Sequence, residues 1–355
     1  MPESRAYTIY RYSYNQYVYS LKTLMQPAAT NKINILNAST NSTKMLSHED
    51  YTVGWICALP LEMSAAKMML DETHSNLPQP ATDHNAYTLG RINGHNMVIA
   101  CLPSGVYGTT SAATVSSQMK YTFPNIQFGL MVGIGGGVPC GSADIRLGDV
   151  VVSQPTKGFS GVVQYDYGKT ISGGRFQQTG TLNKPPQFLL TSIAQLQADD
   201  IGGKHSIAAI LSEIHITEAV FTSPDQDQLF YSTYDHVESE DTCKKCDKNR
   251  LIYREQRTSK EPKIHYGLIA SGNQVMKDGQ TRDRLAQESG ILCFEMEAAG
   301  LMDQLPCIVI RGICDYSDSH KNKKWQGYAA LTAAAYGKML LSVVPMTKIN
   351  PKCSM

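Results

Sequence analysis

Hydrophobic residues along the chain fall into short apolar runs that alternate with longer amphipathic segments. An apolar run such as 51–60, ended by a proline, is typical of a buried strand, and the spacing of apolar residues over 61–72 is typical of a helix. The same patterns predict strands at 95–103, 127–137, 144–155, 263–272 and 306–315, helices at 109–123, 184–197, 281–289 and 328–344, and a strand running into a helix at 291–304. This alternation predicts an α/β sheet covered by helices on both faces.

Two stretches depart from this rhythm. Residues 1–50 carry six tyrosines among polar residues, followed by NASTNSTK, and a flexible leader is favoured over an edge strand and linker packed on the body. Residues 222–263 are polar, charged and without a clear period, as expected of an insertion that decorates one core domain. We therefore predict a single domain at 51–347, containing this insertion, and a tail at 348–355.

The composition is that of a globular protein. The chain has 355 residues, of which 42% are hydrophobic and 18% charged, and the net charge is +1. Such a balanced charge provides no field to recruit nucleic acid or a membrane surface, so we expect neither as a partner. Nine irregularly spaced cysteines are typical of reduced thiols, and neither a membrane-spanning run nor a secretory signal is found. The expected location is the cytoplasm, with the nucleus as the alternative.

Two segments near the C-terminal end combine charged and apolar residues. FEMEAAG (294–300) and VIRGICDYSD (309–318) contain Glu295, Glu297, Arg311, Asp315 and Asp318. Burying a carboxylate is costly unless it has a partner or a chemical task, so this pattern indicates either buried ion pairs or a site. Residues two apart in an extended segment share a face, which would align Arg311 with Asp315. Open α/β sheets bind ligands beyond the carboxyl ends of their strands, where both segments are predicted to lie.

Three further features each allow two interpretations. The glycines of MVGIGGG (131–137) form either a loop that lets the backbone approach a ligand or a plain tight turn. Cys243 and Cys246, with His236 before them, offer zinc ligands, but a structural site normally needs four, so a local redox pair or two solvent-side thiols is favoured. Trp325 is predicted to anchor the last helix rather than to stack on a ligand.

The basic residues of the insertion are a separate question. Arg250, Arg254, Arg257 and Lys260 are predicted to form a solvated face. Contact with phosphate groups is the alternative, because the guanidinium fork matches phosphate oxygens.

Taken in order, several stretches resemble the nucleoside phosphorylase and nucleosidase superfamily. They are YTVGWICALPLEMSAAK, MVGIGGGVP, DIRLGDVVVS, HYGLIASGNQVMKDG, FEMEAAGLM and VIRGICDYSDSHKNKKWQGYAA, which together span roughly residues 50–345. The likeness is greatest to methylthioadenosine/adenosylhomocysteine nucleosidases and to the related N-terminal domains of fungal receptors with NACHT, ankyrin or tetratricopeptide regions. The resemblance implies a three-layer α/β/α sandwich around a mixed, partly barrel-like sheet.

The resemblance also implies roles for individual residues. Glu62 matches the acid that positions and activates the attacking water, and Arg311 the arginine beside the water or phosphate. Asp315 matches the acid that protonates the purine ring, a step that suits an acid in apolar surroundings. Glu297 matches the glutamate that holds the ribose hydroxyls, and Met296 the methionine under the sugar.

Other matches are to supporting positions. The backbone at Val275 and Met276 is expected to edge the purine, and Glu295 to support the site beside Glu297. Gly133, Ile134 and Gly135 match the loop near the water or phosphate, where many relatives carry Ser or Thr at the position of Ile134.

These matches predict a purine nucleosidase that cleaves a nucleoside, or a nucleotide such as ATP, by attack of water. Phosphorylases place an arginine near the position of Glu62, and a carboxylate there would repel a phosphate dianion, so hydrolysis is favoured over phosphorolysis. A non-catalytic nucleoside-sensing module is the alternative from another class. No metal or organic cofactor is expected, and the resemblance implies a homo-oligomer.

Overall fold

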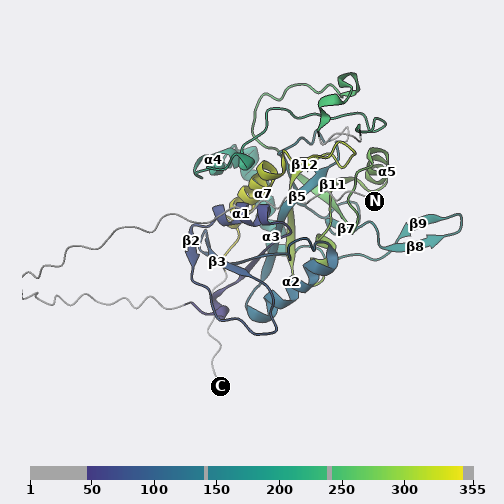
Figure 1. The fold of residues 1–355 in the computed structure, drawn as a ribbon. Coiled ribbons are helices and arrows are strands. Elements are labelled where there is room, and N and C mark those ends of the chain that lie inside the picture. Colours follow the sequence, from purple (N-terminus) through teal and green to yellow (C-terminus); the bar gives the residue numbers. More distant parts are fainter. Residues whose placement is uncertain (1–45, 140–142, 238–241, 347–355) are drawn as a thin grey trace, which may run out of the picture. The chain divides into compact units, whose positions relative to one another are not determined.

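A mixed sheet of ten strands forms the centre of the molecule. The computed structural model describes residues 46–139, 143–237 and 242–346; the predicted tail and residues 1–45 of the predicted leader lie outside them. The strand order is β11-β10-β6-β12-β5-β1-β4-β3-β2, with β7 beside β10 (Figure 1). The strands are β1 (Val53–Cys57), β2 (Glu72–His74), β3 (Tyr87–Ile92), β4 (His95–Cys101), β5 (Phe128–Gly137), β6 (Val150–Ser153), β7 (Val162–Gln164), β10 (Ile264–Ser271), β11 (Ile291–Glu295) and β12 (Cys307–Asp315), and a separate hairpin pairs β8 (Gly168–Ile171) with β9 (Arg175–Gln178).

Helices cover both faces of this sheet. The helices are α1 (Pro60–Met68), α2 (Thr109–Thr122), α3 (Gln187–Ile201), α4 (Ile207–Ser212), α5 (Gly279–Ser289), α6 (Ala298–Leu301) and α7 (Gln326–Leu341). On one face α1, α3 and α4 pack around α7, and on the other α2 packs against α6. The side chains of β1 alternate between the two faces of the sheet: Val53 and Trp55 pack in the core beneath α7, and Ile56 packs in the core beneath α2. The predicted three-layer α/β architecture is confirmed.

The sheet closes on itself at one end. Strand β11 pairs in parallel with β10 and, through Cys293 and Phe294, antiparallel with the end of β5 at Gly136 and Gly137. The sheet is therefore partly barrel-like, as the resemblance implied. The glycines predicted to form a loop or a tight turn are instead the last residues of β5, which pairs with β12 as far as Gly136 and with β11 at Gly136 and Gly137. Both interpretations were wrong because β5 stays paired with a neighbouring strand up to its end.

The remaining differences from the predicted elements are one helix end and several short elements. The helix predicted over 61–72 ends at Met68, and the chain continues into the edge strand β2. The strands β2, β3, β7, β8 and β9 and the helix α4 were not predicted from the sequence. Strands such as β8 are largely exposed, so no alternation of buried and exposed residues marks them. Among the described residues, no helix is both long and apolar enough to cross a bilayer.

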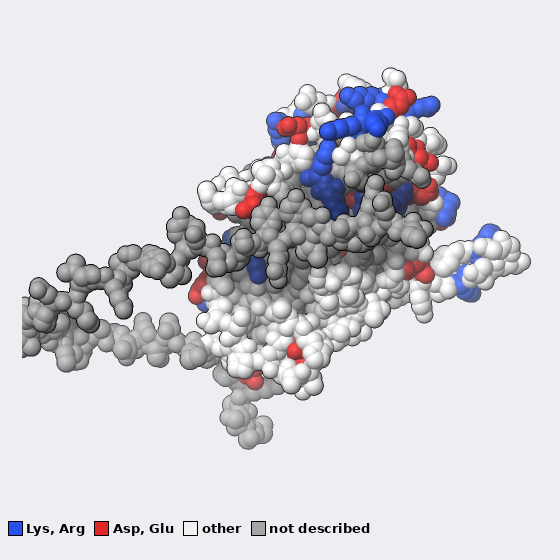
Figure 2. All heavy atoms as spheres, viewed as in Figure 1, with Lys and Arg blue, Asp and Glu red and all other residues white. Residues whose placement is uncertain are grey.

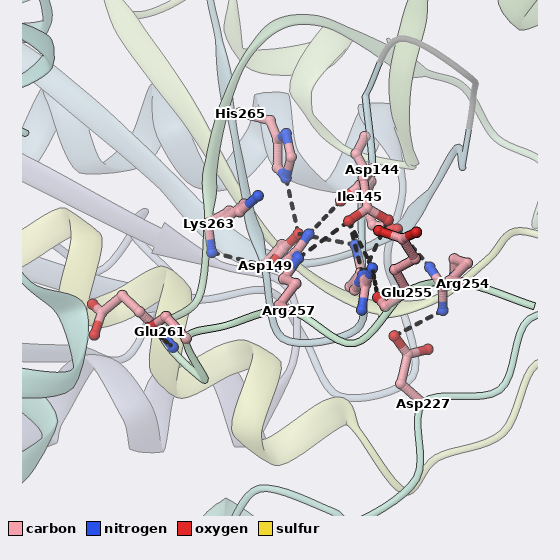
Figure 3. Close-up of polar contacts among 12 residues, drawn as sticks. Asp144, Ile145, Asp149, Asp227, Arg254, Glu255, Arg257, Glu261, Lys263 and His265 are labelled. Atoms are coloured by element: carbon pink, nitrogen blue, oxygen red, sulfur yellow. Dashed lines mark hydrogen bonds and ion pairs between the residues drawn. The ribbon is translucent and has the colours of Figure 1, made fainter. Parts of the chain in front are cut away.

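Two arginines, Arg254 and Arg257, whose side chains are only 16% and 13% exposed, bind the insertion at 222–263 to the core. Arg257 donates to both carboxylate oxygens of Asp149 at 2.7 Å, and Arg254 donates to the carbonyl oxygen of Ile145 at 3.2 Å (Figure 3). Asp149 is 1% exposed and also accepts from the amide of Lys263 and from His265. Burial acts to raise the pKa of Asp149, but Arg257 and His265 outweigh it and hold the pKa below its ordinary value.

The predicted solvated face is therefore wrong for Arg254 and Arg257. It holds for Arg250, whose side chain is 60% exposed. Figure 2 shows Lys and Arg gathered over the insertion, where Lys244, Lys248 and Arg250 are exposed. Trp325 is buried and donates from Nε1 to the carbonyl of Gln226, so the anchoring role predicted for it is confirmed.

Replacing Arg257 should destabilise the protein far more than replacing Arg250. Arg257→Ala leaves the buried carboxylate of Asp149 without its cation, and breaking such a pair costs about 3 kcal/mol or more. Arg250→Ala removes an exposed pair with Asp247, which is worth less than about 1 kcal/mol. The measurement is the free energy of urea unfolding at pH 7 for both variants. Equal losses would contradict the buried role of Arg257.

Candidate active site

The carboxyl ends of β5, β11 and β12 open onto a pocket of about 370 Å³, a volume within the range of small-molecule sites. Most of the residues predicted from the resemblance line it, namely Glu62, Ile134, Gly135, Val275, Met276, Glu295, Met296 and Glu297. Gly133, Arg311 and Asp315 lie immediately behind this lining. The structure thus brings together residues that are more than two hundred positions apart in the chain.

Glu62 is held by backbone amides at the start of α1. Pro60 opens the helix, and the carboxylate Oε2 accepts from the amides of Ala58 and Leu59 at 2.7 and 3.0 Å. The other oxygen accepts from the amide of Ile134 at 2.8 Å. Burial raises the pKa of Glu62, although Arg311 and the three amides oppose the shift. A fixed carboxyl with a raised pKa is suited to take a proton from water.

Gly133 permits Glu62 and Arg311 to meet across β5. A Cβ at this position would collide with the carboxyl group of Glu62 and with Nη1 of Arg311. The expected exposure of backbone amides to a ligand is not found at Ile134, because its N–H donates to Glu62. Its side chain, in contrast, lies in the pocket wall, as does the backbone of Gly135.

Arg311 lies in the middle of a group of carboxylates. Its Nη2 contacts Glu295 directly and lies 3.4 Å from Glu297. Glu295 also accepts from the amides of Glu297 and Ala298, so it fixes both the arginine and the first turn of α6. Arg311 is fully buried rather than open to the pocket, and it reaches the site through the carboxylates it holds. Burial raises the pKa of Glu297 to about 7, against the opposing charge of Arg311.

Asp315 faces a lysine that sequence reasoning missed. The pairing of β12 with β5 shifts between Ile313 and Asp315, so the expected alignment of Arg311 with Asp315 on one face is lost. Asp315 accepts from the amide of Ser317, and Lys321 Nζ lies 2.9 Å from its Oδ2. Lys321 lines the pocket, whereas Asp315 lies behind it. Nothing in KNKKW distinguishes this lysine from its neighbours.

An apolar wall faces the carboxylates. Phe294 lines the pocket beside Val275 and Met276, and its ring packs edge-on against Tyr165 at 5.5 Å between centroids. Sequence analysis placed Phe294 in a strand without giving it a role. The pocket therefore pairs an apolar side, suited to a planar ring, with a side that carries buried carboxyl groups.

The pocket lies at the strand ends of a partly closed α/β sheet and has one apolar and one charged side. These features are typical of enzyme-type domains that bind small ligands. The chain belongs to the phosphorylase superfamily, whose family model matches residues 52–338. The resemblance stated from the motifs is thus confirmed.

The chain is also similar to three individual proteins. A nucleotide-binding leucine-rich repeat (NLR)-like protein of Hyaloscypha variabilis is 50% identical over 312 residues, which are 86% of this chain and 30% of that protein. A 5'-methylthioadenosine/S-adenosylhomocysteine nucleosidase of Mycobacterium bovis is 22% identical over 303 residues, covering 83% of this chain and 97% of the enzyme. The structure of Helicobacter pylori futalosine hydrolase matches with a TM-score of 0.52 at 17% identity, covering 83% and 98% of the two chains. This last match supports the fold alone.

The raised pKa of Glu297 predicts a pH-dependent stability. Between its ordinary value of 4.5 and about 7, the folded protein retains a proton that the unfolded chain has released. The free energy of unfolding should therefore fall as pH rises from 5 to 7, by at most about 1 kcal/mol per pH unit from this group. Urea unfolding at several pH values should show a shallower slope for Glu297→Gln. The surface control Glu288→Gln should keep the wild-type slope, and an unchanged slope in Glu297→Gln would refute the assignment.

Proposed function

We propose that the protein hydrolyses the N-glycosidic bond of a purine nucleoside or nucleotide. The observation that carries this proposal is the buried group of three carboxyls, Glu62, Glu295 and Glu297, around the single cation Arg311. Cleavage of an N-glycosidic bond builds positive charge on the ribose in the transition state. A pocket floor with more carboxylates than cations favours that charge, and it does so more strongly because water is excluded.

The reaction is divided between the two sides of the pocket. Water attacks the anomeric carbon and gives its proton to Glu62, while the bond to the base breaks and its electron pair leaves with the base. Glu297 binds the ribose hydroxyls and Met296 packs under the sugar. The base lies against Phe294, Val275 and Met276.

The leaving base takes its proton from the pair of Asp315 and Lys321. Lys321 is supported in this role by its place in the pocket lining, 2.9 Å from Asp315. Burial acts to lower the pKa of Lys321, but Asp315 outweighs it and raises the pKa, so the lysine remains a hydrogen-bond donor toward the base.

Hydrolysis is favoured over phosphorolysis by the chemistry beside the nucleophile position. Glu62 would repel a phosphate dianion, and Ile134 offers it no hydroxyl. Similarity to a nucleosidase supports the same choice. Two lysines, Lys321 and Lys323, line the pocket. Because Lys321 is assigned to the base, Lys323 is the lining cation left to meet a 5′-phosphate group of a nucleotide substrate.

A sensing role is the second candidate, favoured by one observation. The chain is 50% identical to an NLR-like protein but spans only 30% of its length. A domain of this kind that binds a purine nucleoside without turning it over would report the nucleoside to the rest of a receptor.

A substrate panel distinguishes these functions. Adenosine, inosine, methylthioadenosine and ATP are incubated with the pure protein, with and without phosphate, and the products are separated by chromatography. Hydrolysis gives free base and ribose or ribose phosphate at a rate independent of added phosphate. Ribose 1-phosphate formed only with phosphate would identify a phosphorylase, and binding without turnover would identify a sensor.

Variants of the proton donors should lose turnover while the fold is kept. Asp315→Asn removes the carboxylate that orders Lys321, and loss of general acid catalysis lowers kcat by roughly 10²–10⁴. Lys321→Gln should lower kcat as well, because the donor itself is lost. Glu288→Gln, an exposed carboxylate on α5, serves as the matched control and should retain wild-type kcat. Unchanged turnover in both site variants would exclude the pair from base protonation.

A further inference from the structure

Three potential metal ligands meet in the insertion. The ligand atoms of His236, Cys243 and Cys246 all lie within 4.8 Å of one another. Cys246 is 5% exposed, so the pair is not the two solvent-side thiols offered as one interpretation of the sequence. Two thiolates and an imidazole form a ligand set that zinc prefers. This group lies outside the pocket and takes no part in the proposed reaction.

The candidate for a fourth ligand is His320, which spacing along the sequence did not supply and which lies next to His236, outside the group of three. His320 is buried, and neither ring nitrogen has a hydrogen-bond partner in the described part of the chain. Its ring centroid is 5.5 Å from that of His236, at an interplanar angle of 78°. Two imidazoles on one tetrahedral Zn²⁺ have centroids roughly 5 Å apart, given a Zn–N bond of about 2.0–2.1 Å. The backbone oxygen of His320 is also 3.9 Å from Cys243 Sγ.

The surroundings of His320 are those of a metal-bound histidine. Asp318 Oδ1 lies 3.7 Å from its Nδ1, and a carboxylate at the non-ligating nitrogen is the usual device that orients such a ring. Phe230 stacks on the ring at 4.0 Å between centroids, which fixes the plane of the ring. Two unpartnered nitrogens in a buried ring are otherwise costly.

We propose that His236, Cys243, Cys246 and His320 bind a structural Zn²⁺ ion. The ion connects the insertion to the segment that carries Lys321, the residue directly after His320. It thereby braces the wall of the pocket without contacting the substrate.

The test is a measurement of bound zinc. The full chain is produced without a histidine tag and dialysed free of loose metal, and zinc is measured by mass spectrometry. We expect about one zinc per chain in the wild type and below about one tenth in Cys243→Ser/Cys246→Ser. Cys101→Ser, which alters a thiol outside the cluster, is the control and should retain the metal. His320→Gln should weaken zinc affinity by about tenfold or more.

A titration keeps the test decisive where a variant fails to fold. Chelator-treated wild-type protein is titrated with Co²⁺, whose absorption bands report thiolate ligands in a tetrahedral site, and Zn²⁺ should then displace it. Absence of both zinc and the cobalt bands in the wild type would overturn the proposal, as would a Cys243–Cys246 disulfide in the purified protein. Zinc retained at wild-type level by the double variant would do the same, and unchanged affinity in His320→Gln would overturn that residue as the fourth ligand.

Discussion

The site depends on one buried cation shared by several carboxyl groups. Arg311 is fully buried, and burial alone would lower its pKa, but Glu295, Glu297 and Glu62 outweigh this and raise it. One positive charge cannot balance three negative charges in a buried site, where electrostatic interactions are poorly screened. The ionised forms of the three carboxyl groups are therefore destabilised. Burial raises the pKa of Glu62 and of Glu297, and for Glu297 the charges of Glu295 and Glu62 add to the shift. A substrate that develops positive charge would relieve the same imbalance.

This arrangement requires the sheet to close in the way it does. Strand β5 lies between β12 and β1, and its end also pairs with β11, so three strand ends converge on one point. Such close approach tolerates no side chain at Gly133 or Gly135, where a Cβ would strike Glu62 and Arg311 or Cys293. Gly133 is therefore the condition for Glu62 to approach Arg311.

The features that could be predicted from the sequence are those marked by a local sequence pattern. The buried strands and the α7 helix follow from apolar periodicity, and Glu297 and Asp315 stand out as charged residues in apolar sequence. Glu62 was predicted from the family resemblance alone. Lys321 and His320 stand in a polar stretch without any period, and only the folded chain shows what they face. The burial of Arg257 was not predicted for the same reason. Its partner Asp149 lies directly before β6, over a hundred residues away in the chain. The shifted pairing before Asp315 leaves no trace in sequence spacing.

The insertion contributes to the pocket indirectly, because it holds the segment 316–325, which forms part of the pocket wall. Tyr316 donates to Asp227, Trp325 to Gln226, and the amide of His236 to Ser319, so contacts from the insertion occur along the length of 316–325. Lys321 lies inside this span and points the other way, toward Asp315. Because the segment has no regular secondary structure of its own, its conformation must come from these contacts. The position of Lys321 in the pocket wall is thus set by residues that do not line the pocket.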